Sequence, residues 1–316
     1  MSVERVCVIG AGAIGSLCAV HLARRVDVSI LVRREEHAAD LNSHGLAVSG
    51  KSNFTSEVSA TTDPGELPDF DLGIVATKAT QMDDAIAPLH GRFPSAVFMT
   101  IQNGIGAEEL MASYGDWPLI SSVTFMSGIR HGDHHIEYEL DTATWLGPYH
   151  PGAATLETAE EVGELFVGSG LKAEVLADVR PAQWSKLIFN HAVNSVAAVT
   201  DLPHVALYAR KERRSDLGWL VEGLIDEGKA TATAAGVKLF EDPWEMNVEA
   251  VTTGQTATED YAHVPSMLGD IRAGRRTEIE FISGALVHEA DRLGVDVPLS
   301  RAMYQLVRAR DRSYDD

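Results

Sequence analysis

A glycine-rich turn near the start of the chain places the strongest constraint on its fold. Residues 3–9 form a β-rich run, and an apolar helical pattern continues afterwards to about residue 25. The turn between them reads Gly10, Ala11, Gly12, Ala13, Ile14, Gly15. A second strand at 28–32 completes a strand–helix–strand unit. In such a unit the first glycine allows a tight turn, the second allows a pyrophosphate to approach the backbone, and the third allows the helix to pack closely on the strand. The helix N-terminus also favours an anion. Residues 10–15 therefore predict a dinucleotide site.

The end of the second strand discriminates between the two nicotinamide dinucleotides. An NAD site usually carries an acidic residue there, which accepts a hydrogen bond from the ribose 2′-hydroxyl. This chain has Arg33 instead, and a guanidinium suits a 2′-phosphate. Glu35 and Glu36 follow and could serve an NAD ribose, and Arg33 could be a surface charge. We predict NADP(H) as the preferred cofactor.

Two more strands deliver polar residues at their carboxyl ends, where doubly wound sheets bind their ligands. The run 71–77 ends at Lys78, and the run 97–101 is followed by Asn103. Lys78 could simply be solvated, and Asn103 with Gly104 could be ordinary turn chemistry. Their shared position at strand ends favours roles beside the nicotinamide ribose.

The remaining patterns divide the chain into an α/β half and a helical half. A strand at 172–176 is the last one that the pattern supports. We therefore predict a Rossmann-type N-terminal domain with a doubly wound, mostly parallel sheet over 1–177, and an all-α C-terminal domain over 178–316. Further helices of the second half are predicted at 217–235 and at 243–253.

A helix predicted over 181–199 carries an unusual polar stripe. Lys186, Asn190 and Asn194 recur every fourth residue, so they share one slowly turning face, while the rest of the helix is nearly all apolar. A solvated face is the ordinary explanation of such a stripe. Since the other faces are apolar, we expect a buried helix whose polar stripe lines a cavity. A lysine held there has a lowered pKa and can donate a proton.

A second informative stretch covers residues 266–281. Thr277 and Glu280 form a capping-box pattern, which predicts that a helix starts there and ends at Gly294. Glu278 then lies in a first turn, where backbone N–H groups favour a carboxylate, and this explains it structurally. Ser266 by itself is an ordinary helix N-cap.

Composition limits the partners. The net charge of −20 disfavours nucleic acid and an anionic membrane, although salt adaptation could also produce it. No apolar run approaches a membrane span, and no signal segment is evident. Cys7 and Cys18 are the only cysteines and read as core residues in a reducing compartment, so we expect a cytoplasmic protein. Buried helical faces in the second half make a homodimer plausible.

Histidines around residues 131–135 raise the question of a metal site. The alternation over 121–146 predicts β-hairpins, with a turn that holds His131, His134 and His135. No fourth ligand is evident in the sequence, and neighbouring strand residues alternate between faces. We therefore predict no metal.

With these motifs in view, the chain resembles the ketopantoate reductase (2-dehydropantoate 2-reductase) family over nearly its whole length. The resemblance rests on motifs of different kinds in the right order: GAGAIG at 10–15, Arg33, Lys78 in VATKATQ, Asn103 in IQNGIG, WSKLIFNHAVN at 184–194 and SMLGDIRAGRRTEIEFISG at 266–284. It implies an NADPH-dependent reductase that converts ketopantoate to pantoate, for pantothenate and coenzyme A synthesis.

The resemblance also implies residue roles. Lys186 would donate a proton to the 2-oxo oxygen as hydride arrives, and Glu278 would hold the substrate hydroxyl. The carboxylate and other oxygens of the small 2-oxo acid would be bound by Asn190, Asn194 and Ser266. Lys78 and Asn103 would lie beside the cofactor, Asn103 within reach of the substrate as well, and Asp270 would support its segment.

Two segments depart from the family pattern and border the expected substrate side. Residues 265–270 read PSMLGD where many members have SSMLQD, so that Pro265 replaces serine and Gly269 replaces glutamine, and Ser283 stands where many have asparagine. These departures leave open a reductase of the same build that acts on another 2-oxo acid. A non-catalytic NADP(H) sensor is a further alternative, which the presence of Lys186 disfavours.

Overall fold

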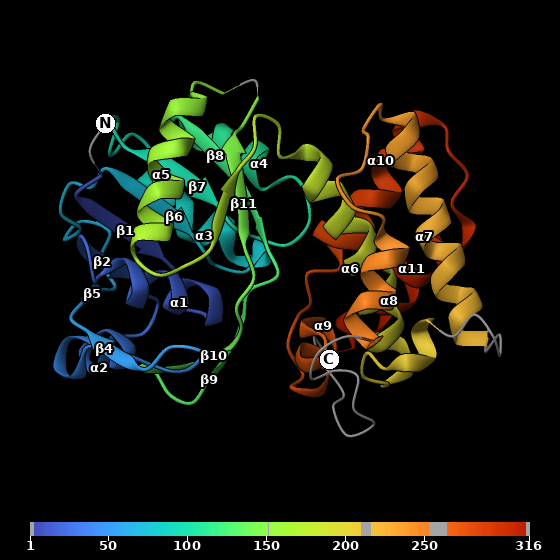
Figure 1. Cartoon of the computed structure of the whole chain (residues 1–316), viewed down its shortest axis with the longest axis horizontal. Coiled ribbons are helices and arrows are strands. Elements are labelled where there is room, and N and C mark those ends of the chain that lie inside the picture. Colours follow the sequence, from blue (N-terminus) through green and yellow to red (C-terminus); the bar gives the residue numbers. More distant parts are fainter. Residues whose placement is uncertain (1–2, 151, 210–215, 253–263, 314–316) are drawn as a thin grey trace. The chain divides into compact units, whose positions relative to one another are not determined.

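The computed structural model describes residues 3–150, 152–209, 216–252 and 264–313. The chain separates into two compact units, shown in Figure 1. The first comprises Met1–Gln102 and Ala107–Val179, and the second comprises Asn103–Gly106 and Arg180–Asp316. The short segment Asn103–Gly106 thus leaves its sequence neighbours and belongs to the second unit.

The first unit is built on an eight-stranded sheet with the order β12-β11-β8-β7-β6-β1-β2-β5. All neighbouring pairs are parallel except β8 and β11, which confirms the doubly wound, mostly parallel prediction. The strands are β1 (Arg5–Ile9), β2 (Asp27–Leu31), β5 (Ser59–Thr61), β6 (Leu72–Val75), β7 (Val97–Thr100), β8 (Leu119–Thr124), β11 (Thr144–Pro148) and β12 (Ala173–Val175).

Helices cover both faces of this sheet, because its strands are apolar on both sides. Along β1, Val6 and Val8 join one core, and Cys7 and Ile9 join the other. The first core includes α1 (Ala13–Leu22) and α5 (Leu156–Gly168), and the second includes α3 (Met82–Ile86) and α4 (Ala107–Tyr114). The remaining helical elements of this unit are α2 (Glu35–His44), η1 (Ala79–Gln81) and η2 (Ala87–Leu89).

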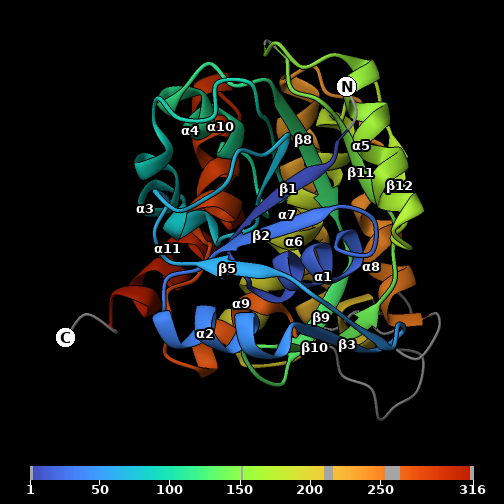
Figure 2. The ribbon, with the colours of Figure 1, turned by 90° about the vertical axis from the view of Figure 1, so that its left-hand side faces the viewer.

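A second, four-stranded sheet lies against α1 and was not expected from the sequence. Its order is β4-β3-β10-β9, with β3 (Leu46–Gly50), β4 (Phe54–Ser56), β9 (Ser127–Arg130) and β10 (His135–Leu140), seen beside α1 and α2 in Figure 2. The hairpin prediction for 121–146 is right for β9 and β10, which pair antiparallel. It is wrong for β11, which returns to the large sheet and pairs with β8.

The second unit is helical in all of its described elements, and α6 (Arg180–Thr200) lies at its centre. This helix packs against most of the others and confirms the helix expected at 181–199. The others are η3 (Ala206–Ala209), α7 (Asp216–Ala234), α8 (Pro243–Thr252), α9 (Ser266–Arg272), η5 (Glu280–Gly284), α10 (Ala285–Leu293) and α11 (Pro298–Arg312). The last residue of the helix expected at 243–253 lies outside the described residues.

The capping box expected at Thr277 and Glu280 does not form. The Thr277 hydroxyl donates to Asp311 Oδ2 at 2.8 Å, and its backbone N–H donates to the same oxygen at 3.1 Å. Glu280 instead accepts from the Tyr304 hydroxyl and forms an ion pair with Arg308. Tertiary partners on α11 therefore outcompete the local pairing, and the segment continues as the π-helix η5 before α10.

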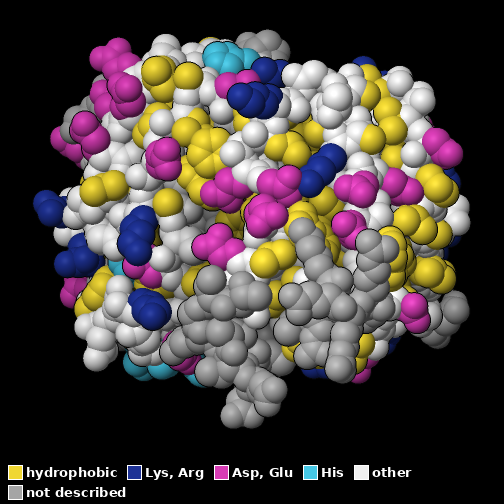
Figure 3. Space-filling view, turned by 45° about the vertical axis from the view of Figure 1, so that its right-hand side comes forward, with side chains coloured by type: hydrophobic (Ala, Val, Ile, Leu, Met, Phe, Trp, Pro, Cys, Tyr) yellow, Lys and Arg dark blue, Asp and Glu magenta, His cyan; other side chains and the backbone are white. Residues whose placement is uncertain are grey.

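No helix among the described residues is long and apolar enough to cross a membrane. On the face shown in Figure 3, acidic side chains are scattered among apolar ones and basic side chains are sparser, in keeping with the charge of −20.

Candidate active site

The polar stripe of α6 is buried, as its apolar surroundings in the sequence suggested. Lys186, Asn190 and Asn194 are only 7%, 8% and 5% exposed. Trp184, Leu187, Ile188 and Val193 of the same helix belong to the core of the second unit. Burial of polar side chains is costly unless they have partners, so such a stripe is unusual for a helix with a purely structural role.

The loop Asn103–Gly106 is attached to this unit through its backbone. The Ile105 N–H donates to the Phe281 carbonyl at 3.3 Å. Gly104 has a φ of +94°, and a Cβ atom placed there would lie 2.0 Å from the same carbonyl oxygen. Only glycine allows this approach, because a side chain would meet both a forbidden backbone conformation and a hard contact.

The position of this loop brings three predicted residues together. The Asn103 side-chain amide donates from Nδ2 to Glu278 Oε2 at 3.3 Å, and Asn103 Oδ1 accepts from Asn190 Nδ2 at 3.5 Å, the long limit of a hydrogen bond. Glu278 is 9% exposed and follows Thr277, which Asp311 anchors. The resemblance placed Asn103 mainly beside the cofactor, but the structure places it between two residues expected to bind the substrate.

The electrostatics of Lys186 suit proton donation. Burial lowers the pKa of Lys186 to about 8, and the negative charge of Glu278 partly opposes this shift. The sequence left open which of the two effects prevails, and the structure shows that burial does. An ammonium group with this pKa is still protonated at neutral pH and gives up its proton far more readily than an ordinary lysine.

This pKa predicts the pH dependence of reduction. A donor role for Lys186 requires its protonated form, so kcat/KM, which reports the free enzyme, should be constant below pH 8 and fall by about tenfold per pH unit above it. The reverse oxidation needs the neutral amine and should instead rise through the same range. Steady-state rates from pH 6 to 10 in both directions test this, and a flat reductive profile up to pH 10 would rule Lys186 out as the donor.

The remaining residues of the 266–284 segment have different surroundings. Ser266 is the exposed first residue of α9 and not its N-cap, which is Pro265. Asp270 is 3% exposed, and its Oδ1 accepts from Arg275 Nε at 3.1 Å and from a terminal nitrogen of the same guanidinium at 2.9 Å. Asp270 thus holds the turn after α9, consistent with a supporting role.

Ser283 pairs with a residue of α6 that lies next to the polar stripe in the sequence. It is fully buried, and its hydroxyl is 2.8 Å from His191 Nδ1, while His191 Nε2 is 2.9 Å from the Ser300 hydroxyl. Burial lowers the pKa of His191 to about 4, so the ring is neutral. Sequence reasoning missed this network. The signal available was His191 itself, a polar residue next to the stripe on an otherwise apolar helix.

In the first unit, residues 10–15 span the expected turn after β1 and the first residues of α1. Gly10 has a φ of +98°, and its N–H donates to the Leu31 carbonyl at 2.9 Å. A Cβ atom at Gly15 would lie 1.9 Å from the Gly10 carbonyl oxygen, so this position requires glycine for packing. At Gly12, by contrast, the nearest atom would be 4.0 Å away. Open space there leaves room for a close approach of a pyrophosphate to the start of α1, where Ala13 is the first helical residue.

The end of β2 leaves one arginine available for a ligand. Two oxygens of Asp133 accept from a terminal nitrogen of Arg34 at 2.6 and 2.7 Å, and Glu35 accepts from the Thr62 hydroxyl. Arg33 is exposed and has no hydrogen bond or ion pair to any residue that the structure describes. Since Glu35 has a protein partner, the basic Arg33 is better suited to meet a ribose substituent. Lys78 is half-buried and occupies the N-cap position of η1, shortly after the end of β6 at Val75.

The first unit carries a dinucleotide-binding turn on a doubly wound sheet, and the helical second unit carries a buried lysine of lowered pKa. This combination is characteristic of nicotinamide-dependent oxidoreductases that reduce carbonyl groups. Comparison with known proteins narrows this class. Residues 6–151 match the family described as ketopantoate reductase PanE/ApbA, and residues 178–311 match the C-terminal part of the same family. The chain belongs to the ketopantoate reductase family.

Individual relatives agree with this assignment. The chain is 32% identical to the 2-dehydropantoate 2-reductase of Pyrococcus horikoshii over 308 residues, which cover 97% of each chain. Among solved structures, a PanE/ApbA family ketopantoate reductase from Ralstonia eutropha is 26% identical, with a TM-score of 0.84 over 99% of this chain and 100% of that one. A D-mandelate dehydrogenase solved with NADH and anilino(oxo)acetate shares the fold at 21% identity, with a TM-score of 0.87 over 99% of this chain and 100% of that one.

Proposed function

We propose that this chain reduces 2-dehydropantoate to pantoate with NADPH, the step that supplies pantoate for pantothenate and coenzyme A. The observation that carries the proposal is the grouping of Lys186, Glu278, Asn103 and Asn190 in one unit, with Lys186 buried and its pKa lowered to about 8. Homologues named 2-dehydropantoate 2-reductase over the full chain support the substrate.

In the proposed reaction, Lys186 donates the proton and stabilises the developing charge. Bound NADPH supplies a hydride to the 2-oxo carbon. The Lys186 ammonium points its hydrogen at the 2-oxo oxygen, stabilises the alkoxide as it forms and then transfers the proton to it. Glu278 accepts a hydrogen bond from the substrate hydroxyl. Its negative charge also favours the protonated form of Lys186 before transfer.

The amides of the stripe orient the substrate. Asn190 and Asn194 present donors from successive turns of α6, and we assign them, with Ser266 at the start of α9, to the carboxylate and remaining oxygens of the substrate. Asn103 keeps Glu278 in place through its 3.3 Å hydrogen bond. Buried polar groups in fixed positions discriminate strongly against substrates that cannot pair with them.

Turnover assays test the proposal directly. Purified protein should consume NADPH rapidly with ketopantoate and slowly with 2-oxo acids of similar size that lack the hydroxyl group, because those leave Glu278 without its partner. Comparable kcat/KM values for the two kinds of substrate would contradict the assigned role of Glu278. Absence of turnover with every 2-oxo acid, despite NADPH binding, would instead favour a non-catalytic NADP(H) sensor.

The cofactor preference depends on Arg33. We propose that residues 10–15 hold the pyrophosphate, Arg33 the 2′-phosphate and Lys78 the nicotinamide ribose. Arg33→Ala should weaken NADPH binding by about 10- to 100-fold, the worth of one charge-assisted hydrogen bond, and change NADH binding by less than about twofold. Arg34→Ala is the matched control, because Asp133 engages that guanidinium. Equal losses for NADPH and NADH in Arg33→Ala would contradict the assignment.

A second candidate substrate is a bulkier 2-oxo acid. One observation favours it: Gly269 on α9 lacks a side chain where many family members have glutamine, and a Cβ atom there would meet nothing within 4 Å. The additional space could hold a larger apolar group. A higher kcat/KM for an aromatic 2-oxo acid than for ketopantoate would establish this alternative.

We further propose a cytoplasmic homodimer. The free, buried thiols of Cys7 and Cys18 support a reducing compartment. The exposed apolar side chains of Leu299 and Leu306 on α11, at 39% and 53%, support an association surface on the second unit. Light scattering of the purified protein measures the mass, and a monomer at micromolar concentration would contradict the dimer.

A further inference from the structure

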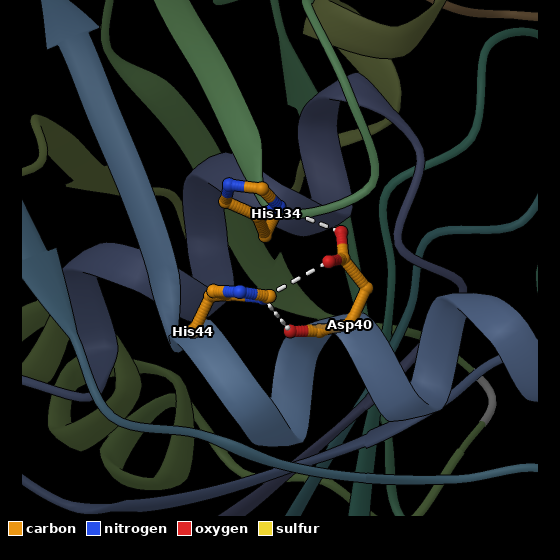
Figure 4. Close-up of side chains that lie close together, drawn as sticks. All are labelled: Asp40, His44 and His134. Carbon is orange, nitrogen blue, oxygen red and sulfur yellow. Dashed lines mark hydrogen bonds and ion pairs between the residues drawn. The ribbon is translucent and has the colours of Figure 1, made fainter.

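Three potential metal ligands converge on the first unit, and none of them has a role in the site described above. Asp40 and His44 lie one turn apart on α2, and His134 comes from the turn between β9 and β10. Their ligand atoms all lie within 4.8 Å of one another. Figure 4 shows both imidazole rings turned toward Asp40: His134 faces its carboxylate, and His44 faces its carboxylate and, at 3.1 Å, its backbone carbonyl oxygen. The sequence suggested only His131 and His135 as partners of His134 and predicted no metal, because α2 is far from this turn along the chain.

Individual distances bring the cluster close to a coordination sphere. His44 Nδ1 is 3.0 Å from Asp40 Oδ1, and His134 Nδ1 is 2.6 Å from Asp40 Oδ2. Ligands of a tetrahedral ion at Zn–N and Zn–O distances of ~2.0–2.1 Å lie about 3.3 Å apart. The two rings are stacked with centroids 4.8 Å apart, and two imidazoles on one such ion would have centroids roughly 5 Å apart. Small side-chain shifts would therefore complete the site.

The surrounding structure holds the two elements together without an ion. The turn is attached to α2 by Arg34, which binds Asp133, and by His37 Nε2, which lies 3.0 Å from the Asp133 carbonyl. The Ala47 N–H donates to the His134 carbonyl at 2.8 Å. Because the backbone on both sides is fixed in this way, an ion would have little ordering cost to overcome.

We propose that Asp40, His44 and His134 form a binding site for a divalent cation of the zinc class on the first unit. Two imidazole nitrogens and one carboxylate oxygen suit Zn²⁺, Cu²⁺ or Ni²⁺ and not the oxygen-seeking Mg²⁺ or Ca²⁺. Partial exposure of the cluster, with side-chain values of 29% for Asp40, 58% for His44 and 41% for His134, leaves a coordination position for water. The bound ion would tie the end of α2 to the β9–β10 turn and stabilise the folded first unit.

Calorimetric titration of the metal-stripped full chain, without a histidine tag, with ZnCl₂ tests the proposal. We expect one ion per chain, a rise in Tm with zinc, and visible bands of tetrahedral Co²⁺ when cobalt replaces zinc. His134→Ala and the near-isosteric Asp40→Asn should each weaken zinc binding by at least about 100-fold, since even outer-shell partners are worth 10–100-fold. His131→Ala is the matched control in the same turn, because that ring pairs with Glu137, and it should leave zinc binding unchanged.

NADPH affinity of each variant verifies that the first unit remains folded, since the dinucleotide turn lies outside the cluster. The proposal is overturned if wild-type protein binds no zinc, if the His134→Ala and Asp40→Asn variants bind it as tightly as wild type, or if His131→Ala abolishes binding. Binding of Mg²⁺ with equal affinity would also overturn it, because that would indicate general attraction to the acidic surface.

Discussion

Replacing Lys186 by methionine should lower kcat for ketopantoate reduction by about 10²- to 10⁴-fold, the usual contribution of a positioned acid. Methionine fills similar space but carries no proton, so the 2-oxo oxygen loses its donor and the alkoxide loses its counter-charge. NADPH affinity should stay unchanged, because the dinucleotide turn belongs to the other unit. Steady-state kinetics and fluorescence titration with NADPH measure the two effects separately.

Lys229→Met is the matched control for this variant. Lys229 lies on α7 of the same unit and forms an ion pair with Asp242 at 2.7 Å on the surface. Exposed ion pairs contribute little, so kcat should stay within about twofold of wild type. Lys186→Arg keeps the charge but not the lowered pKa, because a guanidinium stays protonated, and it should therefore remain slow. Near-normal turnover in Lys186→Met would refute the proposed donor.

The second large effect is expected at Gly104. Gly104→Ala places a methyl group on the Phe281 carbonyl oxygen, at 2.0 Å in the present geometry, and forces alanine to a φ of +94°. The loop must then leave η5, and Asn103 leaves Glu278 and Asn190. Displacement of a positioning residue by about 1 Å can cost 10²-fold in rate, so kcat/KM should fall by about 100-fold or more.

Gly106→Ala separates the loss of contact from backbone strain. Gly106 has a similar φ of +102°, but a Cβ atom there would meet nothing within 4 Å. This variant should lose only about 1–2 kcal/mol of stability from the left-handed backbone, with a much smaller change in kcat/KM. Equal kinetic losses in the two variants would mean that strain, and not the attachment of Asn103 to the second unit, determines activity.

Local patterns in the sequence were sufficient for most of the fold. The strand–turn–helix around Gly10 and Gly15 is specified within a few residues. Gly10 is required by its positive φ, and Gly15 is required by its close contact with the Gly10 carbonyl. The buried stripe of Lys186, Asn190 and Asn194 also follows from the sequence, since helical periodicity and an apolar surround require only the helix itself. The family motifs pointed to the same residues, and both matched halves of the chain bear out the family.

Distant contacts could not be predicted in the same way. Asn103 and Glu278 are 175 residues apart and meet only because Gly104 lets its loop approach η5. Thr277 and Glu280 match the capping-box pattern in the sequence, but their side chains bind residues of α11 and not each other's backbone. Ser283 pairs with His191, 92 residues earlier in the chain, and no local pattern indicates this contact.

The sequence by itself determined the dinucleotide fold, the helical second half and the candidate proton donor, because each of these depends on the spacing of residues along a short stretch. Three properties were decided by the tertiary structure alone. Burial outweighs the charge of Glu278 and lowers the pKa of Lys186, and Asn103 is the residue that holds Glu278. His134 also lies beside Asp40 and His44. These properties depend on the local dielectric and on distances between remote segments, which are set only when the chain packs.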